Sequence, residues 1–575
     1  MKKLFIFVFI LAIVISNVNA LENSMQLLAV QETEDGFIGS LAELTLEIIP
    51  GKGRILLETQ PLTKIDTQVS TRIAKEISCK YLDLDCSNLD FIYTIKSSSS
   101  IIGGPSAGSA MALITTATLK NLEIDEKVVI TGTINSGNII GPVGGIKEKI
   151  DVAETSGFEK VLVPKGEFIE YLNETISVEE YSKFKKIEVI EVSNLDEVLV
   201  EFTNINLSKN NNESVEIDQD YKKIMKNIAV KLCGRTYDMI SNIDESNYTK
   251  RYENLTQDID ELTEKEDYYS AASKCFTNNI RLRNKINENL EITSKILDKL
   301  DEEISDFEKK LDNRKLSNIP NLQTYIVVKE RLNNAKEAND LAREELENNN
   351  SQASIEYYSF SIERLYSAES WSLFFEKEGK TLEINEENLK KSCIDKIEEA
   401  NSRIQYLESI ITIGLNDLDK DLINAKEEYK KGDYALCMNY ASLAKAQADV
   451  IIGGTSIINE TVIKELINQK LEIAKGIIIK QQESELFPIL GYSYYEYSKN
   501  LINESIYSSL LFSQYSMELS DFSLYLENNK KQLDLSFNNE SYLENKSNYE
   551  LFLTYLVGIF SGIIIFGCVY YMNKN

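Results

Sequence analysis

The feature that most constrains the fold of this 575-residue chain is a change of pattern at a polar stretch, residues 204–214. Before it, short apolar runs alternate with glycine turns, and residues 107–120 predict a helix. Four of these runs predict strands: 91–95, 128–130, 161–164 and 186–192. After the stretch, prolines are scarce and apolar residues recur at helical spacing. We therefore expect an α+β domain at residues 24–203, a linker at 204–214 and an all-α domain at 215–548.

The predicted all-α domain carries a weak repeat of helical hairpins. Apolar residues from Leu282 to Leu311 fall at steps of three and four, which predicts one long amphipathic helix. Breaks in the helical pattern recur at similar intervals, at residues 266–268, 350–352, 432–434 and 503–505. Stacked hairpins would produce such breaks, and so would a plain antiparallel bundle.

Both ends of the chain indicate export and a membrane tether. Lys2 and Lys3 precede an apolar run and a small-residue site, so residues 1–20 predict a signal peptide; an uncleaved anchor is the alternative. Residues 551–572 are apolar, uncharged and long enough to predict a transmembrane helix. The expectation is a single-pass protein of the cell membrane with both folded domains extracytoplasmic.

Six of the seven cysteines lie in the predicted ectodomain, where disulfides persist. Six cysteines allow 15 pairings. We expect sequence neighbours to pair, and the candidates are Cys79 with Cys86, Cys233 with Cys275, and Cys393 with Cys437. No CxxC occurs and the chain has no histidine, so we expect no metal site and no cofactor. A net charge of −29 argues against nucleic acid as a partner.

Ser106 stands in Gly-Gly-Pro-Ser-Ala-Gly, residues 103–108, at the predicted start of a helix. A serine there can be a simple helix cap. It also faces unpaired backbone N–H groups, which can hold the oxyanion of an acyl-transfer intermediate. Without histidine the base must be an amine or a carboxylate. Lys147 and Lys149 follow a second glycine turn, and because they point to opposite sides of a helix, only one can face a site.

Residues 90–167 resemble the proteolytic domain of the Lon peptidases. The similarity lies in the strand before the serine, in Gly-Pro-Ser-Ala-Gly, in a Thr-Gly turn at 131–132 and in the glycine-lysine segment 141–149. The resemblance implies Ser106 as nucleophile, Lys149 as general base and Thr131 as the residue that orients it. It also implies an oxyanion region at Gly104, Ser106 and Ala107.

The sequence departs from the Lon pattern in three places. Ile102 and Gly103 replace a Lys-Asp pair, and Thr133 replaces an acidic residue. The sequence contains no G-x-x-x-x-G-K-[ST] motif, which an ATPase module would carry. We therefore expect a membrane-anchored, ATP-independent serine endopeptidase acting on unfolded or flexible polypeptides. A homo-oligomer, by resemblance a hexameric ring, is expected. The alternatives are a non-catalytic Lon-fold scaffold and a helical adhesion or docking protein at the cell surface.

Overall fold

A computed structural model of the chain describes residues 21–521 except 34–35, 103, 136–137, 173, 208–217, 244–249, 380–385, 411–418, 455–459 and 484, together with residues 531–532. The predicted signal peptide, most of the linker, residues 533–548 and the predicted transmembrane helix lie outside these residues. Within them, no helix combines the length and the apolar character that a membrane crossing requires.

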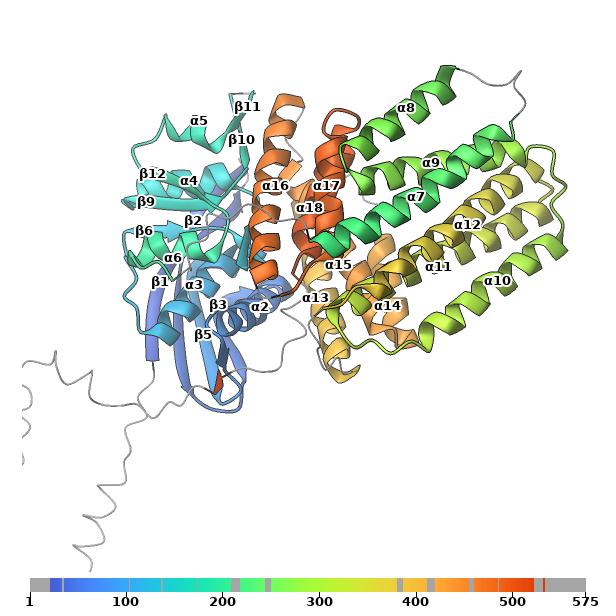
Figure 1. Ribbon diagram of the computed structural model, residues 1–575. Helices are drawn as coiled ribbons and strands as arrows, with labels where there is room; N and C mark the ends of the chain where they lie inside the picture. The colour runs from blue at the N-terminus through green and yellow to red at the C-terminus, as the bar shows by residue number, and fades with distance from the viewer. Residues whose placement is uncertain are drawn as a thin grey trace, which may run out of the picture.

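The chain folds into a sheet-containing domain followed by an array of long helices, shown in blue to cyan and in green to red in Figure 1. The strands of the first domain are β1 (Leu21–Thr33), β2 (Gly36–Pro50), β3 (Ile55–Thr63), β4 (Leu84–Asp85), β5 (Leu89–Ile102), β6 (Val128–Ile130), β7 (Thr133–Asn135), β8 (Ile139–Gly141), β9 (Lys160–Pro164), β10 (Phe168–Tyr171), β11 (Glu174–Ser177) and β12 (Glu188–Val192). Its helices are α2 (Ile65–Tyr81), the short 3-10 helix η1 (Pro105–Ala107), α3 (Gly108–Lys120), α4 (Ile146–Thr155), α5 (Val178–Ser182) and α6 (Leu195–Thr203). The strand β13 (Lys531–Gln532) pairs with β4.

Seven strands form the central sheet in the order β12-β9-β6-β1-β2-β5-β3. Side chains alternate between its two faces, as strand geometry requires. Leu27, Ile130 and Leu162 lie in one cross-strand row and pack under α2, α3 and α6. Their neighbours Leu28 and Val129 face the other side, under α4 and α5. The predicted α+β architecture is thus confirmed as a sheet between two helical layers (Figure 1).

The predicted elements of this domain are confirmed with small shifts of their ends. Residues 91–95 belong to β5, which continues to Ile102 and so reaches the serine turn. The helix predicted at 107–120 is α3, preceded by η1. The last predicted strand begins at Glu188 rather than at residue 186. The first strand begins at Leu21, three residues before the predicted domain start.

The second domain consists, in its described part, of four successive units of three helices. They are α7 (Gln219–Ser241), α8 (Lys250–Glu264) and α9 (Tyr268–Ile286); α10 (Ser294–Asp312), α11 (Ile319–Glu347) and α12 (Ser351–Trp371), followed by η4 (Ser372–Glu376); α13 (Glu386–Ile410), α14 (Asp419–Lys431) and α15 (Tyr434–Gly454); and α16 (Glu460–Glu483), α17 (Ile489–Leu501) and α18 (Ile506–Leu519). Each of the four predicted breaks falls between the second and third helix of a unit. At three of them a residue in the left-handed conformation ends the helix: Glu266, Asn349 and Gly432.

The single long helix predicted from Leu282 to Leu311 is wrong. The segment is two helices, because α9 ends at Ile286 and α10 begins at Ser294. Thr293, which lies within the predicted helix, has an extended backbone and precedes α10 instead. Leu290 is 36% exposed in the connection. Apolar periodicity alone does not reveal a break between two helices when the apolar residues of the second continue the spacing of those in the first.

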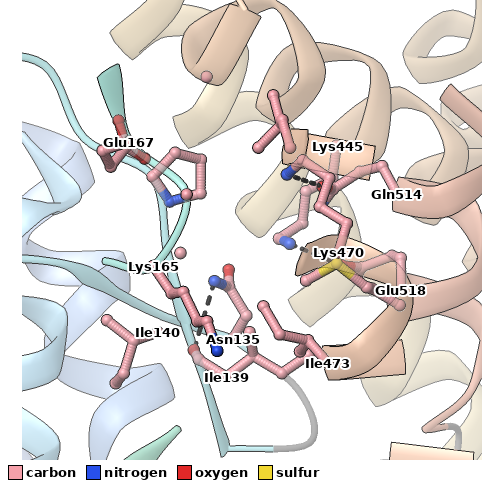
Figure 2. A pocket seen from close by; sticks show the side chains of 16 residues that line it. Asn135, Ile139, Ile140, Lys165, Glu167, Lys445, Lys470, Ile473, Gln514 and Glu518 are labelled. Atoms are coloured by element: carbon pink, nitrogen blue, oxygen red, sulfur yellow. Dashed lines mark hydrogen bonds and ion pairs between the residues drawn. The ribbon is translucent and has the colours of Figure 1, made fainter. Parts of the chain in front are cut away.

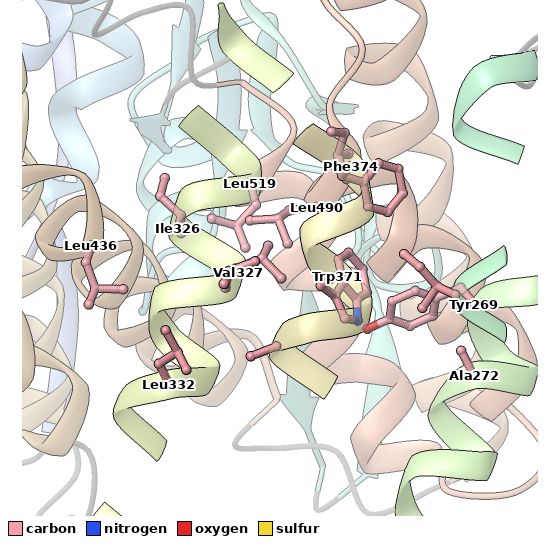
Figure 3. Close-up of a cluster of buried hydrophobic side chains, with 14 of the residues drawn as sticks. Tyr269, Ala272, Ile326, Val327, Leu332, Trp371, Phe374, Leu436, Leu490 and Leu519 are labelled. Atoms are coloured by element: carbon pink, nitrogen blue, oxygen red, sulfur yellow. The ribbon is translucent and has the colours of Figure 1, made fainter. Parts of the chain in front are cut away.

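Three disulfides join the cysteine pairs named above. Cys233–Cys275 ties α7 to α9, and Cys393–Cys437 ties α13 to α15, so each joins the first and third helices of a unit. The apolar core of the helical domain is continuous through these units (Figure 3). Its only tryptophan, Trp371, packs with ring centroids 5.4 Å from Phe374 and 6.0 Å from Tyr269.

Removing a long-range disulfide should destabilise the helical domain. Cys393 and Cys437 close a loop with a sequence separation of 44, whereas Cys79 and Cys86 are separated by only 7. Replacing both Cys393 and Cys437 by alanine should cost about 2–4 kcal/mol, measured by urea unfolding of the oxidised protein. The matched replacement of Cys79 and Cys86 should cost less, since a short loop restricts the unfolded chain less. Equal unfolding midpoints for wild type and the first variant would contradict this.

Candidate active site

The serine turn is shaped by glycine and held by a buried carboxylate. Strand β5 delivers the chain to Gly104, whose φ of +100° suits glycine and turns the backbone into η1. The Gly104 N–H donates to Asp66 Oδ2 at 2.9 Å, and Asp66 is only 6% exposed. Gly104 therefore shapes the predicted oxyanion region through its conformation, while its own N–H is committed to Asp66. Ser106 and Ala107 lie in the first helical turn, where N–H groups lack partners within the helix.

The Thr-Gly turn pairs with the serine turn through the backbone. The Gly132 N–H donates to the Ser106 carbonyl at 3.0 Å, and the Ser109 N–H donates to the Gly132 carbonyl at 3.0 Å. Thr131 is fully buried, and its hydroxyl has no hydrogen-bond partner in the part of the chain that is described. An unsatisfied buried hydroxyl is costly, so this group is poised to bind a further polar atom.

Lys149 is the lysine that faces inward. It lies on α4 and is 2% exposed, whereas Lys147 is half-buried and pairs with Asp151 at 3.0 Å. Burial lowers the pKa of Lys149 to about 7, against the opposing influence of the Glu167 and Glu148 charges. Among the described residues, no carboxylate lies within ion-pairing distance of its amine. An amine with a pKa near neutrality is partly unprotonated at pH 7 and can accept a proton.

One tyrosine from the helical domain contacts both turns. Tyr406 on α13 accepts a hydrogen bond from the Gly144 N–H at 2.6 Å, in the turn that precedes α4. Its ring edge also lies beside the serine turn. A Cβ built on Gly104 would be 3.5 Å from Tyr406 Cε2 and 3.8 Å from Ser106 Oγ. The serine turn and the lysine turn therefore converge on one side chain.

The predicted site residues lie on or just after turns that adjoin one another, but their side chains form no hydrogen bonds with each other in the described part of the chain. No hydrogen bond joins Lys149 to Ser106 or Thr131 within the described residues. Catalytic hydrogen bonds are often long in the absence of substrate and tighten when it binds. The roles of Ser106, Lys149 and Thr131 accordingly stay predictions.

The helical domain packs directly against this site. Arg403 on α13 donates to Thr133 Oγ1 at 2.7 Å. Gly166 has a φ of +83°, and a Cβ there would be 2.4 Å from Gln469 Oε1 of α16. Figure 2 shows the contact, with Asn135, Ile139, Ile140, Lys165 and Glu167 facing residues of α15, α16 and α18 across a narrow cavity. The sheet-containing domain and the helical domain therefore pack against each other over one buried surface.

Behind this surface lies a buried set of charges, here termed the interhelix network. Its six members come from α13, α15 and α18, and each is at most 5% exposed: Lys396, Glu399, Arg403, Lys445, Asp449 and Glu518. Lys445 binds Asp449 at 3.1 Å and Glu518 at 2.7 Å, and Lys396 also pairs with Glu518. Burial would raise the pKa of Glu518, but the two lysines outweigh it and hold that pKa well below its usual range. Three cations balance three anions, as burial of charge requires.

Glu167 connects the network to the candidate base. It is 7% exposed and lies in the segment after β9. Burial raises the pKa of Glu167, and the charges of Lys470, Lys149 and the network residue Arg403 oppose that rise. The carboxyl group thus lies between the amine of α4 and the cations of the helical domain. Sequence reasoning missed Asp66, Glu167, Arg403 and Tyr406.

One family model matches the part of the chain that carries this site. Residues 95–205 match the family model described as the Lon protease (S16) C-terminal proteolytic domain. That range contains Ser106, Thr131 and Lys149.

Three curated relatives show the extent of the similarity. The chain is 30% identical to the archaeal Lon protease of Archaeoglobus fulgidus over 159 residues, which cover 28% of this chain and 24% of that protein. It is 27% identical to the Lon protease of Methanosphaera stadtmanae over 184 residues, 32% of this chain and 22% of that protein. It is 33% identical to the Lon protease of Paraburkholderia phytofirmans over 131 residues, 22% of this chain and 16% of that protein. The chain thus spans at most about a quarter of these relatives.

Breaking the interhelix network should be far more damaging than breaking a surface pair. Lys396→Met leaves Glu518 with one cation fewer in a buried setting and should cost about 3–5 kcal/mol. Lys309→Met is the matched control, because Lys309 pairs with Asp306 while 74% and 70% of the two side chains are exposed. We expect little change from it. Denaturant unfolding of both variants measures the difference, and a similar small loss in both would disprove the structural role of the network.

Proposed function

We propose, from the match of residues 95–205 to the Lon protease (S16) C-terminal proteolytic domain, that the chain is a serine endopeptidase in which Ser106 attacks and Lys149 is the general base. The observation that carries the proposal is the burial of Lys149, in a chain without histidine, on the helix whose preceding turn shares Tyr406 with the turn that holds Ser106. Burial gives this amine a pKa of about 7, which suits a base working near neutral pH.

The proposed reaction follows from the positions of these groups. The Lys149 amine takes the proton of the Ser106 hydroxyl as its oxygen bonds to the substrate carbonyl carbon. Backbone N–H groups of η1, at Ser106 and Ala107, stabilise the resulting oxyanion. The Lys149 ammonium then gives its proton to the departing amine, and water releases the acyl group by the reverse sequence. The Thr131 hydroxyl, buried and without a partner among the described residues, is the group we assign to orient Lys149.

We further propose that substrates are unfolded or flexible polypeptides and that cleavage needs no ATP. Support comes from the missing nucleotide-binding motif in the sequence and from the helical domain packed over the site. The apolar runs 1–20 and 551–572 support export and a membrane tether. Assembly into a ring is proposed from the Lon resemblance alone.

Three variants test the dyad against casein or a quenched peptide. Ser106→Ala and Lys149→Met should each lose nearly all activity with the fold intact, since each removes one half of the proton-transfer pair. Lys147→Met is the matched control: it removes a lysine two positions away that pairs with Asp151, and it should retain activity.

The outcomes separate the alternatives. Equal cleavage by wild type and Ser106→Ala would refute the proposed function. Absence of cleavage by every form would favour the non-catalytic scaffold or the docking protein.

Activity should rise with pH. Below pH 7 the Lys149 amine is protonated and cannot accept the serine proton, so kcat/KM should increase through an apparent pKa of about 7 and then level off. The rate of covalent labelling of Ser106 by a fluorophosphonate should follow the same curve. A profile still rising with a midpoint near 10 would show that Lys149 keeps an ordinary pKa.

A further inference from the structure

Tyr406 comes from the helical domain, yet it stands at the nucleophile. The ring edge and Ser106 Oγ both lie within 3.8 Å of the point where a Gly104 side chain would begin. A substrate carbonyl carbon must approach Ser106 Oγ to about 3–3.5 Å before it can react. A peptide held for attack by Ser106 Oγ therefore comes close to the Tyr406 ring.

The tyrosine hydroxyl also accepts the hydrogen bond of a backbone N–H group in the lysine turn. The Gly144 N–H, which an extended peptide could engage with a carbonyl oxygen, donates to Tyr406 Oη at 2.6 Å. This hydrogen bond and the position of the ring edge beside Gly104 together fix the orientation of the ring. The phenol is thus fixed between the two catalytic turns.

The helix that carries Tyr406 is itself firmly anchored. Arg403, one turn earlier on α13, donates to Thr133 Oγ1 and forms an ion pair with Asp449 at 2.5 Å. Asp449 belongs to the interhelix network and is 1% exposed. Moving α13 away from Ser106 would therefore require disturbing buried charges, so the backbone that carries the ring is fixed.

We infer that Tyr406 is a specificity-determining residue that restricts the position whose carbonyl Ser106 attacks to small side chains. The inference rests on the proposed function. The substrate class it specifies is a flexible polypeptide with glycine, alanine or serine at that position, because a leucine or phenylalanine side chain would meet the fixed ring. Gly104 and Tyr406 together set the size of this subsite.

The test compares cleavage sites in a peptide library read by mass spectrometry. Wild type should prefer small residues at the cleaved position over leucine and phenylalanine. Tyr406→Ala removes the ring and should raise kcat/KM for the large residues, relative to alanine, by about tenfold or more, since a single methylene in a pocket already changes discrimination by 10–200-fold. Tyr406→Phe, the matched control, keeps the ring and should keep the preference.

Each other outcome overturns the inference. A wild type that cleaves after large and small residues alike contradicts it without any variant, so a misfolded Tyr406→Ala does not weaken the test. A folded Tyr406→Ala with an unchanged preference, or with a uniform rise for all peptides, also contradicts it and would make the ring a plain obstruction. Failure of the proposed function can be told apart from failure of this inference. If the proposed function is wrong, Ser106→Ala will cleave as well as wild type.

Discussion

The rest of the structure depends on keeping the Lys149 amine out of water. An exposed lysine is charged at neutral pH and cannot act as a base, and the chain has no histidine to replace it. Lys149 on α4 is only 2% exposed, and burial lowers its pKa to about 7. A buried, weakly basic amine is destabilising on its own, so the surrounding fold must hold it in place.

The helical domain contributes to that enclosure. Tyr406 and Arg403 bring α13 onto the serine and lysine turns, and the interhelix network fixes α13 from behind. Because the network is balanced in charge and fully buried, it resists rearrangement more than an apolar contact of the same size would. Glu167 lies between this network and Lys149, so the charge state of one influences the other. The helical half therefore contacts the candidate site directly through α13.

Much of the fold could be predicted from the sequence. That residues of both domains meet at the candidate site could not. Strand periodicity located β5, β6 and β9, and cysteine spacing identified the joined pairs, because both signals are local. Ser106 and Lys149 were found through motif resemblance. Physical reasoning could not decide whether Lys147 or Lys149 is the base, because the decision depends on which side chain is buried. Burial is defined only by the tertiary structure. Tyr406 lies far along the chain in a helix without a motif, and no local pattern connects it to Gly104.

The central claim, a Lys149 amine that is neutral near pH 7, can be measured directly by NMR titration of protein carrying ¹³C-labelled lysine. We predict that one lysine signal titrates with a pKa of about 7, and that this signal is absent from Lys149→Met but present in Lys147→Met. A spectrum in which every lysine titrates near 10 would contradict the account, because Lys149 would then be an ordinary charged lysine and not a base.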